Sequence, residues 1–400
     1  MTATGVKEAG ATQAVRSRRV HYLSGFDPRG ARFYHRLYRE ESAKQSRHNG
    51  SVLEVGERRR VTPQVSAWSV RAEWEGRQVS TEYEFMEWDD IVRQHWDASL
   101  PKLFRRGVPT YIKYAAGGGF NRIRKVSKGA FYTAIFPFVY LVSLAAILMV
   151  VALLGAWLSS LFFGKGLMSA GIALGITCGL GLVGLRLAER HNVFWVLRTC
   201  VFIVVWGTRS VPELDQRMAE MAAHIMRQQE AHPVDEVLII GHSVGSILAV
   251  AVTARILEGA RLGKVPAALH LLTLGQCIPY LSFIPSARAF RRDLEILAND
   301  ERIPWTDATA PPDPLCFYQV DPIRVSGIAT QFEERPKRVG VRILPMFRPD
   351  TYAKMRWNKV RVHFQYLMAS ERAADYDYFW ITAGPGKGAA PGGVSVGERP

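Results

Sequence analysis

The pattern of apolar and polar positions predicts strands that alternate with helices. Residues 237–240 form a branched apolar run, and small and aliphatic residues continue at helical spacing over 245–251. Further strands are predicted at 20–23, 51–58, 64–74, 80–87, 267–274 and 303–308, with a turn at Glu75-Gly76. An amphipathic helix is predicted over 212–230, with one side formed by Leu214, Met218, Met221, Ala222 and Ile225. We therefore expect an α/β fold with a mostly parallel sheet covered by helices.

Two long uncharged runs interrupt this pattern. Residues 129–164 contain no charged residue, and residues 166–185 form a second such run. Each run is long enough to cross a bilayer core, which needs about 20 apolar residues. The sequence therefore predicts a two-helix transmembrane hairpin inserted into the α/β domain. Glycines at 171, 175 and 179 share one helical face, which predicts close packing of the second span.

The charge distribution predicts the orientation of this hairpin. The turn between the spans holds only Lys165, whereas the flanks carry Lys102, Arg105, Arg106, Lys113, Arg122, Arg124, Lys125, Lys128, Arg186 and Arg190. Because cations are retained on the inside, we expect the α/β domain at the cytoplasmic face of the inner membrane. The net charge of +15 comes without a recognised nucleic-acid motif, so anionic membrane lipid is the expected partner and nucleic acid is not.

These patterns divide the chain into five segments. They are a disordered basic N-terminus at 1–18, the first part of the α/β domain at 19–128, the hairpin at 129–190, the second part of the domain at 191–382 and a disordered tail at 383–400. The apolar stretch 191–207 is interrupted by Arg198 and is too short to span a membrane alone. It fits either an interfacial helix or a part of the core.

The candidate chemistry lies at residues 241–245, which read Gly-His-Ser-Val-Gly. A strand, a Gly-x-Ser-x-Gly turn and a helix form a nucleophile elbow, and Ser243 is the predicted nucleophile. Gly241 and Gly245 leave room for the neighbouring strand and helix. The backbone NH of Val244 is the predicted first donor of an oxyanion hole. The same motif around Ser395 lacks a flanking strand and helix, so it is not favoured.

The loop after the strand at 20–23 is the expected source of the second oxyanion-hole donor. The candidates are the backbone NH groups of Gly25 and Phe26. Asp27 followed by Pro28 predicts a capped helix that runs to about Arg47. A plain loop with a capped helix would explain the same residues.

A serine nucleophile needs a base and an orienting acid, which follow it along the chain in the order acid, then histidine. His270 lies inside a predicted strand, so His363 is the predicted base, with a structural histidine as the alternative. Asp313, in a proline-rich loop just past the strand at 303–308, is the preferred acid, and Asp321 is the reserve. The pair Asp89 and Asp90 is interpreted as the start of a helix rather than a metal or acid/base site.

With these residues in place, the chain resembles the α/β-hydrolase superfamily, in particular lipase- or esterase-like serine hydrolases. The matching features are the elbow at 237–245, Ser-Gly-Phe-Asp at 24–27, Pro-Asp-Pro at 312–314 and the late His363. The resemblance covers 19–382 apart from the hairpin, although Ser24-Gly25 replaces the usual His-Gly of the oxyanion loop. It implies a Ser243–His363–Asp313 triad with no metal and no organic cofactor.

The function expected from these patterns is a membrane-anchored serine hydrolase that cleaves carboxylic esters, with lipid-like acyl esters as the expected substrates. A non-catalytic membrane scaffold that retains the hydrolase fold is the alternative from another class. The oligomeric state and the choice between hydrolysis and acyl transfer are left open by the sequence.

Overall fold

A single mixed sheet forms the centre of the domain in the computed structural model, which describes residues 14–97, 99–209, 211–260 and 269–386. Within these residues the sheet has nine strands in the order β2-β4-β5-β1-β6-β7-β8-β9, and β3 pairs with β4. The strands are β1 (Ser17–Leu23), β2 (Val52–Val55), β3 (Arg59–Thr62), β4 (Val65–Trp74), β5 (Arg77–Met86), β6 (Glu236–His242), β7 (Leu269–Leu274), β8 (Trp305–Thr309) and β9 (Lys337–Gly340).

The sheet is mostly parallel, as predicted. Strands β5, β1, β6, β7, β8 and β9 run parallel to one another, and β2, β3 and β4 form an extension beside β5 in which all pairings are antiparallel. Carboxyl ends of parallel strands meet at one edge of a sheet. The loops that follow β1, β6, β7 and β8 therefore lie next to one another.

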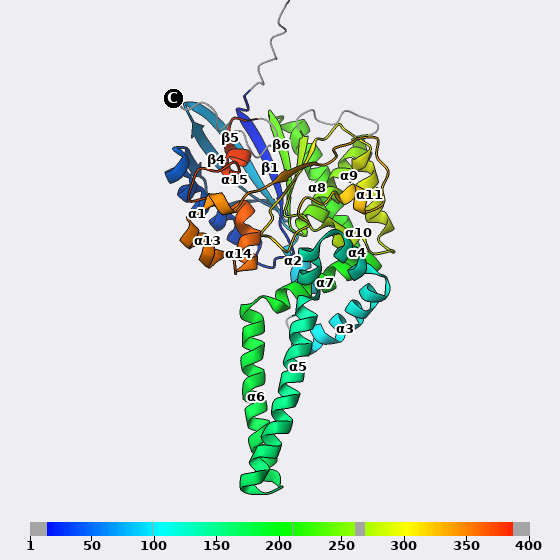
Figure 1. The fold of residues 1–400 in the computed structure, drawn as a ribbon. Coiled ribbons are helices and arrows are strands. Elements are labelled where there is room, and N and C mark those ends of the chain that lie inside the picture. Colours follow the sequence, from blue (N-terminus) through cyan, green and yellow to red (C-terminus); the bar gives the residue numbers. More distant parts are fainter. Residues whose placement is uncertain (1–13, 98, 210, 261–268, 387–400) are drawn as a thin grey trace, which may run out of the picture.

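Helices cover both faces of this sheet (Figure 1). They are α1 (Gly30–Asn49), α2 (Asp89–His95), α3 (Leu100–Ala116), α4 (Gly119–Val126), α5 (Lys128–Phe163), α6 (Leu167–Arg190), α7 (Val193–Thr208), α8 (Pro212–Ala231), α9 (Gly245–Gly259), α10 (Ile278–Ser282), α11 (Arg288–Ala298), α12 (Pro322–Val325), α13 (Pro349–Met355), α14 (Lys359–His363) and α15 (Tyr378–Ala383), with short 3-10 helices at Leu344–Met346 and Phe364–Leu367.

The alternation of side chains along β6 explains why both faces need a cover. Val237 and Ile239 belong to a core that includes α8, α9 and α11, whereas Leu238 and Ile240 belong to a second core with α1 and α15. The predicted helix at 212–230 is confirmed as α8, and its five apolar positions are all buried. Two-sided burial of this kind is typical of a parallel sheet.

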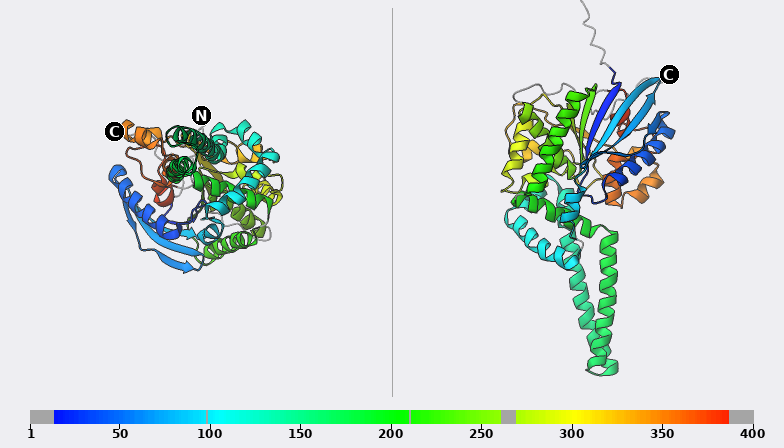
Figure 2. Two further views of the ribbon diagram at one scale, coloured as in Figure 1. Left: turned by 90° about the horizontal axis from the view of Figure 1, so that it is seen from below. Right: turned by 180° about the vertical axis from the view of Figure 1, so that it is seen from behind.

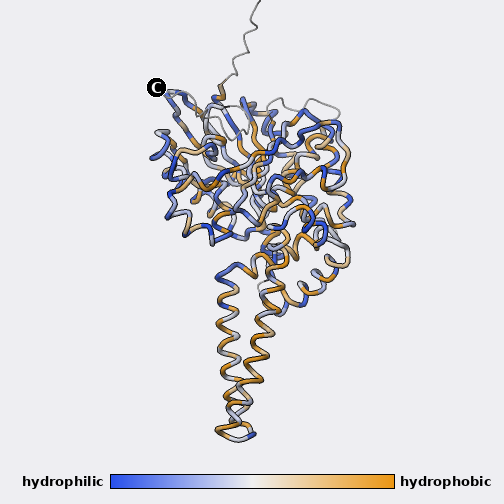
Figure 3. Tube along the Cα trace, in the orientation of Figure 1, coloured by the Kyte–Doolittle hydropathy of each residue, from blue (hydrophilic) through white to orange (hydrophobic). Residues whose placement is uncertain are grey.

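Helices α5 and α6 project from the domain as a hairpin (Figures 1 and 2). Their apolar windows have mean hydropathies of 2.7 and 1.8, and none of the α5 window is buried. Figure 3 shows the apolar colouring along both helices. By length and composition the two helices can cross a membrane, and a third candidate arises only if α7 and α8, bent by 87°, are taken as one broken span.

The glycine face of the second span is not the face that packs against α5. A Cβ atom placed on Gly171, Gly175 or Gly179 would meet no atom within 4 Å, so this glycine face points away from α5. The close approach uses other glycines, since a Cβ on Gly184 would lie 2.4 Å from Leu144 Cδ1 and one on Gly155 would lie 3.5 Å from Ala173. Helical spacing identified a glycine face but not the direction in which it points.

The segment left open at 191–207 belongs to the core. Helix α7 buries nine of its residues, among them Phe202 and Arg198, and packs against α3, α5, α6 and α10. The Arg198 guanidinium donates to the carbonyl of Asp97 at 3.0 Å, which satisfies the one charge in this apolar helix. An amphipathic helix that sequence analysis missed is α3, which exposes Val108 and Ile112.

Two predicted boundaries also change. Strand β1 begins at Ser17, and Val15 and Arg18 are buried, so the prediction of disorder up to residue 18 is wrong for residues 14–18. The Arg18 guanidinium pairs with Glu236 and donates to the carbonyls of Gly384 and Gly386. Ordered structure therefore extends past residue 382, and residues 1–13 and 387–400, including Ser395, lie outside the described residues.

Candidate active site

Ser243 occupies a strained turn between β6 and α9. Its φ is +59°, a left-handed value that is costly for a residue with a side chain. The flanking glycines explain how the turn closes. A Cβ on Gly245 would lie 2.1 Å from the carbonyl oxygen of Leu23, and one on Gly241 would lie 2.4 Å from that of Gly245. The chain can therefore turn here only with glycine at both positions.

The loop after β1 lies directly against this serine. A Cβ on Gly25 would be 3.0 Å from Ser243 Cβ and 3.4 Å from its Oγ. Phe26 lines the same cavity as Ser243. Val244 precedes the first residue of α9, so its NH belongs to the helix-start groups that lack an intrahelical acceptor. The backbone of Gly25 and Phe26 and the amino end of α9 thus border the Ser243 side chain.

Asp27 does not cap α1, which corrects the prediction for this residue. The helix begins at Gly30, and Arg29 occupies the cap position without a side-chain cap bond. The Asp27 carboxylate accepts from the backbone NH of Arg29 at 3.0 Å, directly before the helix, and also from the Arg29 guanidinium at 2.6 Å and the Tyr34 hydroxyl at 2.9 Å. These bonds fix the loop that carries Gly25 and Phe26.

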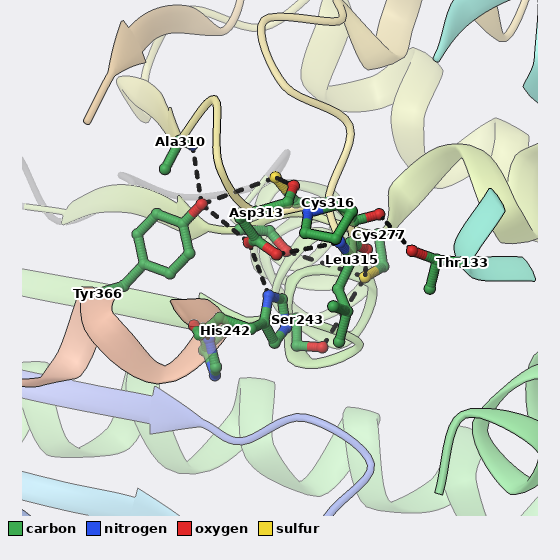
Figure 4. Close-up of polar contacts among 12 residues, drawn as sticks. Thr133, His242, Ser243, Cys277, Ala310, Asp313, Leu315, Cys316 and Tyr366 are labelled. Carbon is green, nitrogen blue, oxygen red and sulfur yellow. Dashed lines mark hydrogen bonds and ion pairs between the residues drawn. The ribbon is translucent and has the colours of Figure 1, made fainter. Parts of the chain in front are cut away.

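Asp313 and His363 form a buried pair. Asp313 lies in the loop after β8, and His363 is the last residue of α14; the distance from His363 Nδ1 to Asp313 Oδ2 is 2.7 Å. The Asp313 carboxylate also accepts from the backbone NH of Leu315 at 3.0 Å and from the Tyr366 hydroxyl at 3.1 Å. Figure 4 shows Asp313 between Tyr366 and the elbow.

The electrostatics of this pair favour an ionised acid. Burial alone would raise the pKa of Asp313, but the charge of His363 and the hydrogen bonds to the carboxylate lower the pKa below its ordinary value. An ionised carboxylate only accepts hydrogen bonds, so Nδ1 of His363 carries the proton. Nε2 of His363 has no hydrogen-bond partner among the described residues.

Asp321 does not reach this pair. Its carboxylate accepts from the backbone NH groups of Ile323 and Arg324 at 2.9 and 3.1 Å and so caps the short helix α12. Both of its bonds are local. Of the two candidate acids, the structure brings only Asp313 to His363.

The Ser243 hydroxyl faces a neighbour that the sequence analysis missed. Its Oγ lies 3.8 Å from Sγ of Cys277, and burial raises the pKa of the Cys277 thiol. Nε2 of His363 has no hydrogen-bond partner among the described residues, so no hydrogen bond joins it to Ser243 Oγ. Long or absent hydrogen bonds between such groups are common in sites without a ligand. Because Cys277 follows β7 at the same edge of the sheet, the rule that located Asp313 could also have located Cys277.

His242 forms a hydrogen bond with the backbone of His363, the candidate base. Its Nε2 donates to the carbonyl oxygen of His363 at 2.9 Å, and its ring is buried. Burial, followed by the charge of His363, lowers the pKa of His242 to about 3. The ring therefore stays neutral at pH 7. It fixes the backbone of the base rather than exchanging protons.

A cavity of about 70 Å³ opens beside Ser243. Its lining combines Ser243 and His363 with apolar and aromatic side chains, including Trp195, Ile203, Tyr280, Leu315 and Phe364. Three of its residues, Cys200, Ile203 and Tyr280, also line a second small cavity under α3 and α4. The chemistry of these walls suits an apolar chain next to a reactive serine.

One group of side chains in the described ranges has the composition of a metal site. His21, Glu84 and His224 are buried with their ligand atoms within 4.8 Å of one another. Glu84 Oε2 is already 2.7 Å from Nε2 of His224, and the histidines lower the pKa of Glu84 although burial opposes this. The nearby charge of Arg19 disfavours an added cation at His21. We therefore interpret the group as a buried structural cluster of one carboxylate and two histidines.

Asp89 and Asp90 lie in the first turn of α2, as predicted. Each also pairs with a cation: Asp89 with Arg93, and Asp90 with Arg217 at 2.8 Å. The pair therefore stabilises a helix and its contact with α8.

Comparisons of the chain with protein-family models, with curated proteins and with solved structures find no match. Function is therefore inferred from the site itself.

Proposed function

We propose that the protein is a membrane-anchored serine hydrolase with an α/β-hydrolase-like fold that cleaves carboxylic esters of lipid-like acyl groups. The observation that carries this proposal is the convergence of Ser243, His363 and Asp313 at one edge of a parallel sheet. The serine stands in a positive-φ elbow, and the histidine is hydrogen-bonded to a buried carboxylate.

The reaction proceeds in two halves. Ser243 Oγ attacks the ester carbonyl while Nε2 of His363 takes the hydroxyl proton, and the oxyanion forms next to the amino end of α9 and the Gly25–Phe26 loop. The carbon–oxygen bond to the alcohol breaks, and His363 returns the proton to the leaving alcohol. Water then attacks the acyl-serine and gives a proton to His363. The bond from the acyl carbon to Ser243 Oγ breaks, His363 returns the proton to Oγ, and a carboxylic acid is released with free Ser243. Asp313 stabilises the imidazolium in both halves.

The helix arrangement supports a membrane-derived substrate. The cavity beside Ser243 is lined in part by Thr133 of α5 and by α7, so it opens close to the root of the hairpin. Helix α3 runs beside the hairpin and combines cations with the exposed apolar side chains Val108 and Ile112, a composition suited to a membrane surface (Figure 1). In this proposal the hairpin spans the inner membrane and the domain lies on its cytoplasmic face.

The test is covalent labelling of the detergent-solubilised chain with a fluorophosphonate, which reacts with activated serines. Wild-type protein should label, and Ser243→Ala should not. Cys277→Ala should retain the label, because the buried, protonated thiol is a poor nucleophile. Ser395→Ala serves as the second control.

Two outcomes would contradict the proposal. Labelling that survives in Ser243→Ala would assign the nucleophile to another residue. A folded wild-type protein that neither labels nor hydrolyses any ester would favour the non-catalytic scaffold instead.

A further inference from the structure

A groove of about 610 Å³ runs between the root of the hairpin and helices α13 and α14. Most of its lining comes from three places: the first turns of α5, the end of α6, and α13 with α14. The residues are Tyr132, Thr133 and Phe136; Arg190, His191 and Asn192; and Lys354, Trp357, Asn358, Lys359 and Val360, with Val196, Pro314 and Leu315 completing the walls. Figure 1 shows α14 beside the upper end of α6. The groove therefore lies where the two long apolar helices join the domain.

The groove is cationic along its open side. Arg190, Lys354 and Lys359 line it and are exposed, and none of its lining residues is acidic. In the part of the chain that the structure describes, none of these three cations forms an ion pair, whereas exposed arginines such as Arg59, Arg60 and Arg342 do. Three unpaired cations around one concave surface favour an anionic ligand.

The exposed aromatic residues of the groove indicate where the groove would lie relative to a membrane surface. Trp357 is 72% exposed and Tyr132 is 63% exposed, and Lys359 Nζ lies 5.8 Å from the centre of the Trp357 ring. Exposed tryptophan and tyrosine next to lysine are typical of the lipid headgroup region. The apolar surface of α5 continues directly from Phe136.

The groove leads to the candidate nucleophile. Thr133, Val196, Leu315 and Val360 line both the groove and the cavity beside Ser243. Lys359 and His363 are the first and last residues of α14, so one short helix carries both a cation of the groove and the candidate base.

We propose that this groove binds the phosphate headgroup of an anionic membrane phospholipid, which places the ester of that lipid at Ser243. The proposal rests on the hydrolase function proposed above and names its substrate class. Arg190, Lys354 and Lys359 bind the headgroup, and the ester passes between Thr133 and Val360. The lipid enters sideways from the leaflet that faces the domain.

The first test measures binding without catalysis. Full-length Ser243→Ala protein in an uncharged detergent is titrated by calorimetry with dihexanoylphosphatidylglycerol, dihexanoylphosphatidylcholine and inorganic phosphate. Phosphatidylglycerol should bind about tenfold more tightly than phosphatidylcholine, because phosphatidylcholine has no net charge. Adding Lys354→Gln and Lys359→Gln should weaken phosphatidylglycerol binding by about tenfold, and arginine at both positions should restore it.

A matched control keeps the same change in net charge. Arg77 and Lys337 are exposed and begin β5 and β9, so they lie at the edge of the sheet opposite Ser243. Arg77→Gln with Lys337→Gln should leave phosphatidylglycerol binding unchanged. Equal weakening by both pairs would overturn the headgroup site, and so would inorganic phosphate binding as tightly as phosphatidylglycerol.

The second test separates this proposal from the hydrolase function. In mixed micelles, the ratio of kcat/KM on phosphatidylglycerol to kcat/KM on a neutral diacylglycerol should fall about tenfold in Lys354→Gln/Lys359→Gln. An unchanged ratio in an active enzyme would overturn the headgroup site alone. A wild-type protein that cleaves no ester would overturn the hydrolase function, while the calorimetry would still decide whether the groove binds the lipid.

Discussion

The Thr133 hydroxyl donates a hydrogen bond of 2.7 Å to the carbonyl oxygen of Pro314. Thr133 lies in the first turns of the long apolar helix α5, and Pro314 directly follows Asp313. Gly129 packs against the same proline, since a Cβ there would lie 3.4 Å from Pro314 Cα. The root of the hairpin therefore contacts the loop that holds the candidate acid.

Thr133→Val should lower kcat several-fold with little change in KM on a short soluble ester. Valine keeps the shape but loses a bond worth about 1 kcal/mol, which allows the Asp313 loop to shift. Thr177→Val in α6 is the control, because its hydroxyl bonds only within its own helix, to Ala173. A Thr133→Val enzyme with the same kcat as the control would show that the contact does not hold the acid in place.

Asp313→Asn should lower kcat by about four orders of magnitude, because the amide can present its NH₂ group to His363 and favour the wrong tautomer. Asp321→Asn should stay close to wild type, since asparagine can still cap α12. Steady-state rates of the two purified variants on one ester make the comparison. A larger loss in Asp321→Asn would reassign the acid.

The stability of the protein should fall as the pH falls from about 6.5 toward 3. The pKa of His242 is lowered to about 3 in the fold, whereas it is 6.5 ordinarily. Between these values the unfolded chain binds a proton that the folded chain does not, so one such group reduces the unfolding free energy by up to about 1.4 kcal/mol per pH unit. Urea unfolding in detergent at several pH values measures this slope. The slope should be shallower in His242→Asn, and an equal slope would exclude His242 as its source.

Gly245→Ala should destabilise the fold by more than about 3 kcal/mol. The new Cβ would overlap the backbone carbonyl of Leu23, and backbone cannot move aside as a flexible side chain could. Gly259→Ala at the other end of α9 meets no atom within 4 Å and should stabilise the helix by about 0.5–1 kcal/mol. Thermal unfolding of the two variants should therefore move in opposite directions. If Gly245→Ala unfolded at the wild-type temperature, the tight elbow would be wrong.

Features encoded within a few residues were predictable from the sequence. The strand, turn and helix around Ser243 depend on local pattern, and Asp313 followed from the rule that loops after parallel strands share an edge. Strand β3 was missed because Arg59 and Arg60 lie on an exposed side strand, where no apolar alternation is needed. The sequence could not decide whether segment 191–207 is an interfacial helix or part of the core, because an apolar helix suits both places. Only its tertiary contacts distinguish the two.

The contacts that complete the site join segments distant along the chain. The bond from Tyr366 to Asp313 and the bond from Thr133 to Pro314 have no local signal. Asp27 shows the opposite case. Its local sequence predicts a helix cap, but α1 begins at Gly30 and the Asp27 carboxylate bonds to Arg29 and Tyr34. Local rules predict elements, but only the packed chain decides which side chains meet.

The position of β1 in the sheet has a consequence for the order of assembly. β1 lies between β5 and β6, and its Arg18 reaches the carbonyls of Gly384 and Gly386, yet helices α5 and α6 are translated before β6. In the membrane-anchored protein proposed above, a ribosome would deliver the hairpin to the translocon while β1 still has one open edge and Arg18 has no acceptor. That edge can pair wrongly with other chains. Nascent chains paused shortly after α6 should therefore need a chaperone on the cytoplasmic side, and those extended past residue 386 should not.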